Sequence, residues 1–245
     1  MTGALPEAPP PDPPADPAAR RRCDDRGALA VVGTDTGIGK TVVTAGLVGG
    51  LRERGADAAA VKPVQTGYPP DDDAGYVRAA CGDGTATCLE RLEPPLAPAV
   101  AAAREGVDLS YDELREGCAR ALADAAPGVL EGIGGLRVPL AGDREVIDLV
   151  AALGVPAVVV ARSGLGTLNH TALSVEALER RGVPVLAVVL NEYAGETVAE
   201  RTNPEVIAGM VDAPVHAVPP LSLSGPADAL AVADHLDSLV AALLE

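Results

Sequence analysis

A glycine-rich turn between an apolar run and a helical segment constrains the fold of this chain more than any other feature. The run Ala28–Gly33 is apolar and ends in glycine, as buried strands do. After the turn, Val43, Leu47 and Leu51 recur at helical spacing. The turn itself reads Gly33-Thr34-Asp35-Thr36-Gly37-Ile38-Gly39-Lys40-Thr41. Because backbone N–H groups converge at the N-terminus of a helix in such a unit, the turn predicts a phosphate-binding loop, or P-loop.

Two side chains of this P-loop have predicted roles. Lys40 is expected to reach the β- and γ-phosphates of a nucleoside triphosphate, and the Thr41 hydroxyl is expected to bind Mg²⁺. The spacing is a variant of the standard loop, because Thr34 occupies the place of the usual first glycine. A glycine turn with an incidental lysine is the alternative. The strand before the turn and the helix after it favour the nucleotide-binding interpretation.

The rest of the chain alternates between apolar runs and segments with helical periodicity. Further strands are predicted at 58–62, 129–131, 155–161, 183–191 and 215–218. Helices are predicted at 111–125, 144–153, 169–181, 204–211 and 227–244, with shorter ones near 74–80 and 97–104 in an otherwise irregular region, 67–108. The strands are apolar throughout, which is typical of a parallel sheet covered on both faces. The sequence therefore predicts a P-loop NTPase-like α/β fold, with a mostly parallel sheet, in a single domain over residues 27–245.

The charge and composition of the chain disfavour some classes of binding partner and indicate the compartment in which it acts. The formal net charge of −16 disfavours nucleic acid and anionic membranes, because both are polyanions. No apolar run reaches the length of a membrane span, and the cysteines form no CxxC pair. These features predict a cytoplasmic protein with reduced thiols. Residues 1–26, rich in Pro, Ala and Asp, are predicted to be a disordered tail.

Polar residues follow the second predicted strand, at the edge where open parallel sheets bind ligands. Lys62 opens the segment Lys62-Pro63-Val64-Gln65-Thr66-Gly67, which is predicted to be a loop because Pro63 ends the strand. A second cation there would stabilise charge on a transferring phosphoryl group, and a solvated lysine is the alternative. The run Asp71-Asp72-Asp73 would supply a carboxylate to Mg²⁺. A solvated acidic loop that caps a helix explains the same residues.

Three later polar residues also lie at the ends of predicted strands or at the start of a predicted helix, on this edge of the sheet. Glu131 ends the strand 129–131 and would hold Mg²⁺ or its water, or it stands there by chance. Asn169 is predicted as the N-cap of the next helix, where free amides suit a ligand carboxylate, although plain capping also explains it. Asn191 ends the strand 183–191 and would read a nucleobase edge, because a carboxamide both donates and accepts; a turn residue is the alternative.

Together these segments resemble the dethiobiotin synthetase family, whose members use ATP to close the ureido ring in biotin synthesis. The resemblance covers residues 28–245, and the motifs occur in family order. The segments that carry it are the P-loop, Lys62–Gly67, Asp71–Asp73, Glu131-Gly132-Ile133-Gly134-Gly135, Gly166-Thr167-Leu168-Asn169-His170-Thr171 and Val189-Leu190-Asn191. Each motif alone is modest evidence for the family, but the occurrence of all of them in one chain, with the same variant P-loop spacing, is specific to it.

The resemblance implies a reaction without a covalent enzyme intermediate. One amine of 7,8-diaminononanoate takes up CO₂, supplied as such or as bicarbonate, to form a carbamate. The carbamate oxygen attacks the γ-phosphate of ATP, and the second amine then closes the ring and expels phosphate. The protein would position the reactants and neutralise charge.

The resemblance also implies the residues that act at the reacting groups. The carbamate and γ-phosphate would be surrounded by Lys62, Lys40 and Thr36. The Mg²⁺ cofactor would be held by Thr41, Asp73 and Glu131.

Other implied residues bind the rest of the substrate and the nucleotide. Thr66 would form a hydrogen bond in the substrate region. The distal carboxylate of the substrate would bind, across a homodimer interface, to Thr167, Leu168 and Asn169. The nucleotide would be bound by Gly37, Ile38, Gly39, Lys40, Thr41, Asn191, Pro219 and Leu221.

Three departures from the family pattern leave alternatives open, and one is that the predicted strand before Glu131 is short and interrupted by Pro127-Gly128. Gly37 stands where many members carry Glu, and Ile133 replaces the usual Ala, so its bulk is expected to bear on the position of Glu131. A related cobyrinic acid diamide synthase-like enzyme would carry a fused glutaminase domain, for which the sequence leaves no room after Glu245. A ParA/MinD-like switch ATPase would have an additional lysine early in the P-loop, where this chain has Thr34-Asp35-Thr36. A nucleotide-binding module without turnover is the third alternative.

Overall fold

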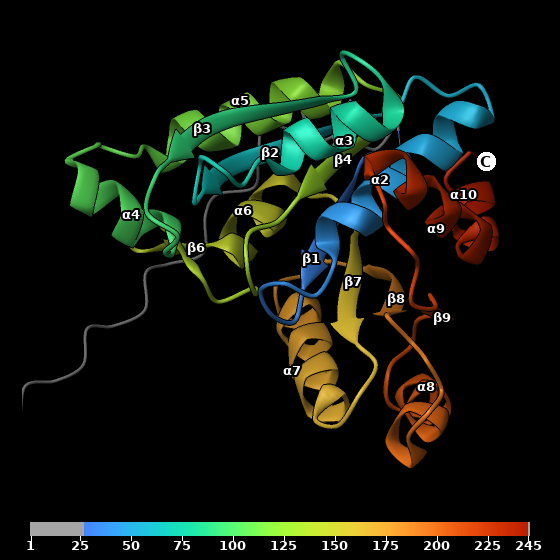
Figure 1. The fold of residues 1–245 in the computed structure, drawn as a ribbon. Coiled ribbons are helices and arrows are strands. Elements are labelled where there is room, and N and C mark those ends of the chain that lie inside the picture. The colour runs from blue at the N-terminus through green and yellow to red at the C-terminus, as the bar shows by residue number, and fades with distance from the viewer. Residues whose placement is uncertain (1–26, 245) are drawn as a thin grey trace, which may run out of the picture.

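Seven parallel strands form the central sheet of the computed structural model, which describes residues 27–244 (Figure 1). The strand order across the sheet is β3-β2-β4-β1-β7-β8-β9. The strands are β1 (Leu29–Gly33), β2 (Ala59–Thr66), β3 (Ala86–Leu92), β4 (Gly128–Glu131), β7 (Ala157–Arg162), β8 (Val185–Asn191) and β9 (Val215–Ala217). Every paired neighbour in this sheet is parallel, which confirms the predicted fold class. The predicted tail, residues 1–26, lies outside the described residues.

Helices cover both faces of the sheet and enclose two apolar cores of mostly Val, Leu and Ala side chains. One face is covered by α2 (Lys40–Glu53), α3 (Asp73–Cys81), the 3₁₀ helix η1 (Pro226–Ala231), α9 (Val232–His235) and α10 (Asp237–Ala242). The other face is covered by α4 (Pro98–Glu105), α5 (Tyr111–Ala123), α6 (Val146–Leu153), α7 (Thr167–Arg180) and α8 (Val198–Met210). A small hairpin of β5 (Pro139–Ala141) and β6 (Arg144–Glu145) precedes α6. Within residues 27–244, no helix has both the length and the apolar character that crossing a membrane requires.

The central position of β1 determines which residues reach the ligand edge of the sheet. All residues of β1 are buried, and the strand lies between β4 and β7. Val31 pairs with Glu131 on one side, and Gly33 pairs with Val160 on the other. Because the carboxyl ends of parallel neighbours lie at the same edge, the turn after β1 meets Glu131 and the end of β7 there.

The prediction that Pro63 ends the second strand is wrong. β2 continues through Pro63 to Thr66, so Lys62 lies inside a strand and not in a loop. Along a strand the N–H groups point alternately to the two neighbours, and Ala59 donates on the β4 side. Pro63, four residues later, faces the same side, where pairing with β4 has already ended at Val61. The missing N–H of proline therefore removes no bond from the sheet.

Three other predictions of secondary structure need correction. The region 67–108 was expected to lack strands, but β3 pairs with β2 along most of its length. This edge strand is partly exposed and carries Glu90 and Arg91, so it has no continuous apolar run to reveal it. The closing helix predicted at 227–244 is divided into η1, α9 and α10. Arg144 and Glu145, which were expected to be helical, form β6.

Candidate active site

The P-loop after β1 packs tightly against the end of β8. Gly39 is the N-cap of α2 and has a left-handed backbone with φ of 90°. A Cβ atom at Gly39 would lie 2.1 Å from Nδ2 of Asn191. The same amide donates a hydrogen bond to the carbonyl oxygen of Ile38 at 3.1 Å. Position 39 therefore requires glycine both for its backbone and for this contact, and Asn191 supports the path of the loop.

A cleft of about 630 Å³ lies beside the P-loop at the carboxyl edge of the sheet. Its walls come from the P-loop, the end of β2, the start of α3 and the turn after β4. The predicted residues that line it are Thr36, Gly37, Gly39, Lys40, Thr41, Lys62, Thr66 and Asp73. The fold thus assembles residues from separate motifs around one space.

Lys62 is the centre of a buried ion cluster in this cleft. Its Nζ atom lies 2.5 Å from Oδ2 of Asp73 and 2.9 Å from Oε1 of Glu131. It also donates to the carbonyl oxygen of Gly132 at 3.0 Å. The Thr41 hydroxyl donates to the same Oε1 atom of Glu131 at 2.8 Å. Lys62 is 4% exposed and Glu131 is 2% exposed, so neither is a solvated surface residue.

Two carboxylates share one ammonium group in this cluster, and their pKa values shift in opposite directions. Burial favours a higher pKa for Asp73, but attraction to Lys62 and the hydrogen bonds around the carboxylate together outweigh it and lower the pKa below its usual value. Burial, together with repulsion from Asp73, raises the pKa of Glu131 despite Lys62. Burial opposes the charge of Lys62, but the two carboxylates outweigh it and raise the pKa of this lysine. With Lys62 protonated, the cluster is one positive charge short of neutrality when both acids are ionised.

Lys40 brings a second ammonium group to the cleft. Its Nζ atom donates to the carbonyl oxygen of Asp35, within the P-loop, at 2.9 Å. Burial, followed by repulsion from Lys62, lowers the pKa of Lys40 to about 8. A phosphate group bound in the loop would favour the charged form of Lys40 and would gain from the adjacent backbone amides.

Thr41, Asp73 and Glu131 have the donor chemistry that Mg²⁺ requires. They offer one hydroxyl and two carboxylates, and Glu131 contacts Thr41 directly. Mg²⁺ binds one or two protein carboxylates and completes its shell with water and phosphate oxygens. Over residues 27–244, no group of three or more His, Cys, Asp or Glu could hold a metal ion by itself. The donor set therefore fits an ion that arrives with a nucleotide, and it does not fit a dense all-protein metal site.

The predicted carboxylate-binding residues lie outside this cleft, in the first turn of α7. The hydroxyl of Thr167 is buried 3.3 Å from the Thr171 hydroxyl, while Asn169 is exposed. The prediction that Asn169 caps the helix is wrong, because α7 begins earlier. Its N-cap is Gly166, whose φ of 92° provides the left-handed start. Leu168 is half-buried in the same turn.

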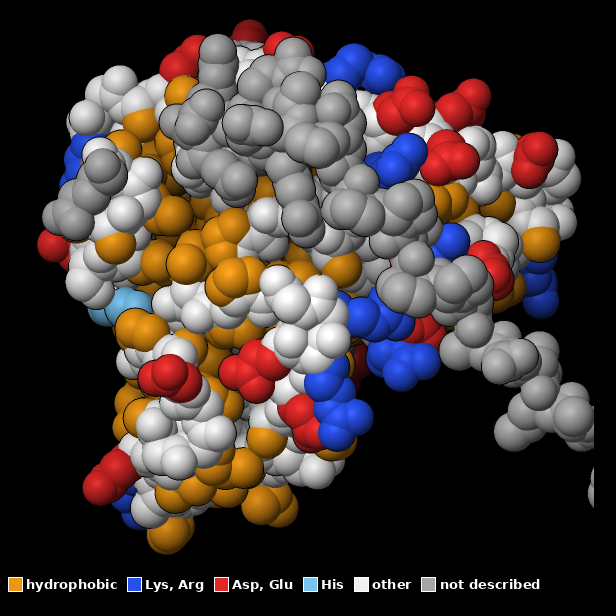
Figure 2. All heavy atoms as spheres, turned by 180° about the vertical axis from the view of Figure 1, so that it is seen from behind, with side chains coloured by type: hydrophobic (Ala, Val, Ile, Leu, Met, Phe, Trp, Pro, Cys, Tyr) orange, Lys and Arg blue, Asp and Glu red, His pale blue; other side chains and the backbone are white. Residues whose placement is uncertain are grey.

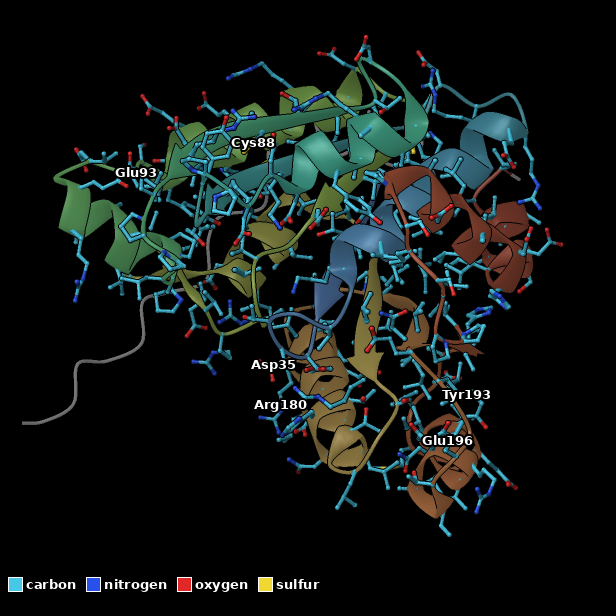
Figure 3. All side chains as sticks on the ribbon, in the orientation of Figure 1. Asp35, Cys88, Glu93, Arg180, Tyr193 and Glu196 are labelled. Carbon is cyan, nitrogen blue, oxygen red and sulfur yellow. The ribbon has the colours of Figure 1, made fainter. Side chains whose placement is uncertain are left out.

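The segment with Pro219 and Leu221, which was predicted to bind the nucleotide, follows β9 and runs beside the end of β8. Val218 donates its N–H to Leu190, and Tyr193 donates to Val218. Tyr193 is labelled on the segment that leaves β8 in Figure 3. Pro219 and Leu221 come next and are both half-buried. They therefore lie close in the fold to Asn191, although none of the three lines the cleft.

Sequence reasoning missed the contacts made by Asp35. Its carboxylate accepts the Thr36 N–H at 2.8 Å and pairs with Arg162, at the end of β7, at 2.5 Å. Figure 3 shows Asp35 in the turn of the P-loop, on the side facing α7. Asp35 was part of the quoted motif, but nothing in the local pattern indicates its partner 127 positions later. Ile133 lines the cleft, and Glu131 still contacts Lys62 beside it.

Comparisons with known proteins agree with this geometry. A family model described as an AAA domain matches residues 27–227. The ATP-dependent dethiobiotin synthetase BioD of Haloferax mediterranei is 64% identical over 210 residues, which cover 85% of this chain and 90% of that protein. The chain belongs to the ATP-dependent dethiobiotin synthetase family. A protein of the same name from Anaeromyxobacter dehalogenans is 47% identical, and the match covers 72% of this chain and 78% of that protein. One from Mycobacteroides abscessus is 43% identical, and the match covers 78% of this chain and 86% of that protein.

Solved structures at low sequence identity share the fold of this dethiobiotin synthetase family member. A ParA family ATPase from Chlorobium tepidum matches with a TM-score of 0.57 and 14% identity, over 89% of this chain and 99% of that one. The septum site-determining protein MinD from Pyrococcus horikoshii, complexed with Mg-ADP, matches with a TM-score of 0.55 and 19% identity, over 87% and 93% of the two chains. At these identities the likeness shows the fold alone, and it confirms the P-loop NTPase-like prediction.

Proposed function

We propose that this chain catalyses the ATP- and Mg²⁺-dependent conversion of 7,8-diaminononanoate and CO₂ to dethiobiotin, ADP and phosphate, a step of biotin biosynthesis. The observation that carries the proposal is the position of the buried Lys62 cluster beside the P-loop. Lys40, Lys62 and Asp73 line one cleft, and Glu131 contacts Lys62 beside it. Membership of the dethiobiotin synthetase family supports the same reaction. Because the reaction consumes ATP, we place it in the cytoplasm.

Each step of this reaction forms one bond, and protons leave from the amines. An amine nitrogen of the substrate adds to CO₂ and loses a proton, which gives a carbamate. A carbamate oxygen then bonds to the γ-phosphorus of ATP, and the bond from that phosphorus to the ADP oxygen breaks. The second amine attacks the carbamate carbon, loses its proton, and displaces inorganic phosphate. No side chain has to become covalently attached, so the protein acts by positioning and charge stabilisation.

Lys40, Lys62 and Thr36 are the proposed catalytic residues. Lys40 and Thr36 line the cleft from the P-loop, and Lys62 enters it from β2. Two ammonium groups from separate elements would stabilise the negative charge that spreads over the transferring phosphoryl group. Gly37 and Gly39 would add backbone amides, since phosphate binds at the N-terminus of a helix.

Thr41, Asp73 and Glu131 are the proposed Mg²⁺ ligands. When bound, the ion would neutralise charge on the β- and γ-phosphates. In the structure, Asp73 and Glu131 both contact the ammonium of Lys62. A cation that draws these carboxylates away would leave Lys62 free to donate to substrate oxygens.

We also propose a homodimer in which the first turn of α7 binds the substrate carboxylate of the partner's site. Thr167, Leu168 and Asn169 line no part of the cleft in their own chain, so a shared site accounts for their predicted role. Two large apolar side chains flank this turn, with Leu165 90% exposed and Leu173 56% exposed. Seen from behind, the lower end of the molecule, where α7 and α8 lie, shows many hydrophobic side chains (Figure 2). Burying such residues against a second copy would stabilise the dimer.

The nucleobase is proposed to lie over the ends of β8 and β9. Asn191, Pro219 and Leu221 converge there, next to the P-loop residue Ile38. The amide nitrogen of Asn191 already donates to Ile38, which leaves its oxygen as the group that could accept from a base amino group. The exocyclic amine of adenine is such a donor, so ATP is the proposed nucleotide.

A coupled assay of ADP release tests the proposed function. ADP is expected only when the diamine and bicarbonate are both present, and dethiobiotin should form in equal amount. ATP hydrolysis at the same rate without the diamine would contradict the proposal and would indicate a switch ATPase.

Lys62→Ala is expected to abolish turnover while leaving nucleotide binding largely intact, because Lys62 lies outside the P-loop. Removing one partner of a buried ion cluster costs about 3–5 kcal/mol. Lys62→Gln is therefore tested beside it as a less disruptive variant, with Arg120→Ala, in an exposed pair with Glu116, as the control. Near-normal ring closure in a folded Lys62 variant would refute the catalytic role.

A further inference from the structure

Gln65 is a buried carboxamide that lines the cleft, and its two polar ends bond two other residues that line it, Thr66 and Asp73. It is the seventh residue of β2 and is 5% exposed. Its Nε2 group donates to the carbonyl oxygen of Thr66 at 2.9 Å. Its Oε1 atom accepts the backbone N–H of Asp73 at 2.9 Å. A buried amide is costly unless its donor and acceptor are both paired, so this geometry is strongly defined.

We propose that Gln65 is a positioning residue that holds Asp73, on the metal side, in register with Thr66, on the substrate side. The inference rests on the proposed function, which assigns Asp73 to Mg²⁺ and Thr66 to the diamine. Gln65 itself touches neither reactant in this assignment. It acts through the two backbone groups that it bonds.

The start of α3 needs such an anchor because the connection to β2 is a loop. Asp73 is the first residue of α3, and its N–H has no partner within the helix. The N-cap residue Asp72 accepts from Gly75, which sets the local shape of the first turn. That bond does not determine where the helix lies relative to the sheet. Gln65 adds a direct link to the sheet, because it belongs to β2 and its side chain bonds the backbone of α3.

The Lys62–Asp73 ion pair also links β2 to α3, but ligands compete for it. Both of its side chains are assigned to bind reactants, Asp73 to the metal and Lys62 to the phosphoryl group. When they do so, their contact at 2.5 Å is weakened or lost. The hydrogen bond from Asp73 to Gln65 uses backbone on one side and a neutral amide on the other. It therefore persists while the charged groups change partners, and it keeps the carboxylate within reach of the cleft.

Two substitutions separate the two ends of Gln65. Gln65→Met keeps the length and flexibility of the side chain and removes both hydrogen bonds. Gln65→Glu retains an oxygen acceptor for the Asp73 amide and loses the amide donor to Thr66. The control is Thr85→Val, because Thr85 is 1% exposed and donates to Gly82 at 2.6 Å, away from the cleft. Thr85→Val shows how the loss of a buried hydrogen bond affects the protein when Asp73 keeps its position.

Mg²⁺ binding is measured by calorimetry with a non-hydrolysable ATP analogue, alongside kcat and KM for the diamine. Gln65→Met is expected to weaken Mg²⁺ binding about tenfold and to raise KM for the diamine, whereas Thr85→Val changes neither. Gln65→Glu is expected to keep Mg²⁺ affinity within about threefold of the parent while KM still rises. In an Asp73→Asn background, Gln65→Met should have little further effect on Mg²⁺ binding, since it acts through Asp73.

The results distinguish the inference from the function on which it rests. If the parent chain releases no ADP with diamine and bicarbonate, the proposed function fails, and the role of Gln65 falls with it. If the parent is active but Gln65→Met binds Mg²⁺ as tightly as the parent, the inference alone is overturned. It is also overturned if Gln65→Met and Gln65→Glu lose Mg²⁺ affinity equally, or if the effects of Gln65→Met and Asp73→Asn are additive.

Discussion

The substitution Gly39→Ala should destabilise the protein far more than Gly37→Ala, although both glycines lie in the P-loop with a left-handed backbone. The φ values are 90° at Gly39 and 69° at Gly37. An alanine in this conformation costs about 1–2 kcal/mol at either position. A Cβ atom at Gly37 meets nothing within 4 Å, whereas one at Gly39 lies 2.1 Å from Nδ2 of Asn191.

The contact at Gly39 adds the cost of a lost hydrogen bond. Asn191 is 8% exposed, and relief of the clash pulls its amide away from the Ile38 oxygen. Leaving a buried polar group unpaired costs about 1–3 kcal/mol. Gly39→Ala should therefore cost about 2–5 kcal/mol in free energy of unfolding, against about 1–2 kcal/mol for Gly37→Ala. For a chain of this size the corresponding falls in Tm are roughly 4–20 °C and 2–8 °C.

Scanning calorimetry of the nucleotide-free variants measures these differences. The decisive comparison repeats Gly39→Ala in an Asn191→Ala background, where the obstructing amide is absent. There the cost of Gly39→Ala should fall to that of Gly37→Ala, since only backbone strain remains. Equal falls in Tm for the two single variants, or an unchanged cost of Gly39→Ala without Asn191, would refute the proposed contact.

Three further predictions follow from the charges of the molecule. Nucleotide affinity should fall as pH rises above about 8 in a calorimetric titration, because the pKa of Lys40 is lowered to about 8 and its charged form binds phosphate. The free energy of unfolding of the nucleotide-free protein should rise from about pH 8 to the ordinary lysine pKa, because the buried charge of Lys40 is lost over that range. A flat affinity between pH 7 and 10 would contradict this role. Arg162→Ala removes an exposed pair with Asp35, so the free energy of unfolding should fall by less than about 1 kcal/mol, while the nucleotide Kd rises several-fold as the P-loop loosens. The control Arg120→Ala, which breaks the exposed pair with Glu116, should leave the Kd unchanged. Finally, the net charge of −16 predicts that Tm rises between 0.1 and 1 M KCl, as the Debye length shortens from about 10 to about 3 Å, and a falling Tm would count against it.

Local features of the sequence were sufficient to predict the strand, the turn and the helix that form the P-loop. The apolar run before Gly33, the glycine turn and the helical spacing after Lys40 are consecutive, and each depends on nearby residues. Glu131 and Asn191 were also placed correctly, at the ends of β4 and β8, because an apolar strand ends where a polar residue follows it. Parallel pairing then brings these ends to one edge of the sheet.

Strands and helices whose existence or bounds depend on adjacent elements or on a capping residue were predicted less well. Pro63 was expected to end a strand, but β4 has stopped pairing with β2 before the proline is reached. Gly166 starts α7 ahead of Asn169 because a left-handed glycine serves as the cap. The edge strand β3 has no apolar pattern of its own, and it is a strand because β2 offers it free hydrogen-bonding groups.

The sequence by itself predicted the kind of chemistry, since a P-loop lysine, a following threonine and acids after strands are the residues expected around a bound phosphate and a metal ion. Only the tertiary structure decided which groups meet. Lys62 reaches Glu131 across 69 positions, Thr41 reaches it across 90, and Asp35 reaches Arg162 across 127. Such contacts arise from strand order and helix packing, which no local pattern encodes. The pKa shifts of the cluster have the same origin, because burial and the distances between charges exist only once the chain has folded.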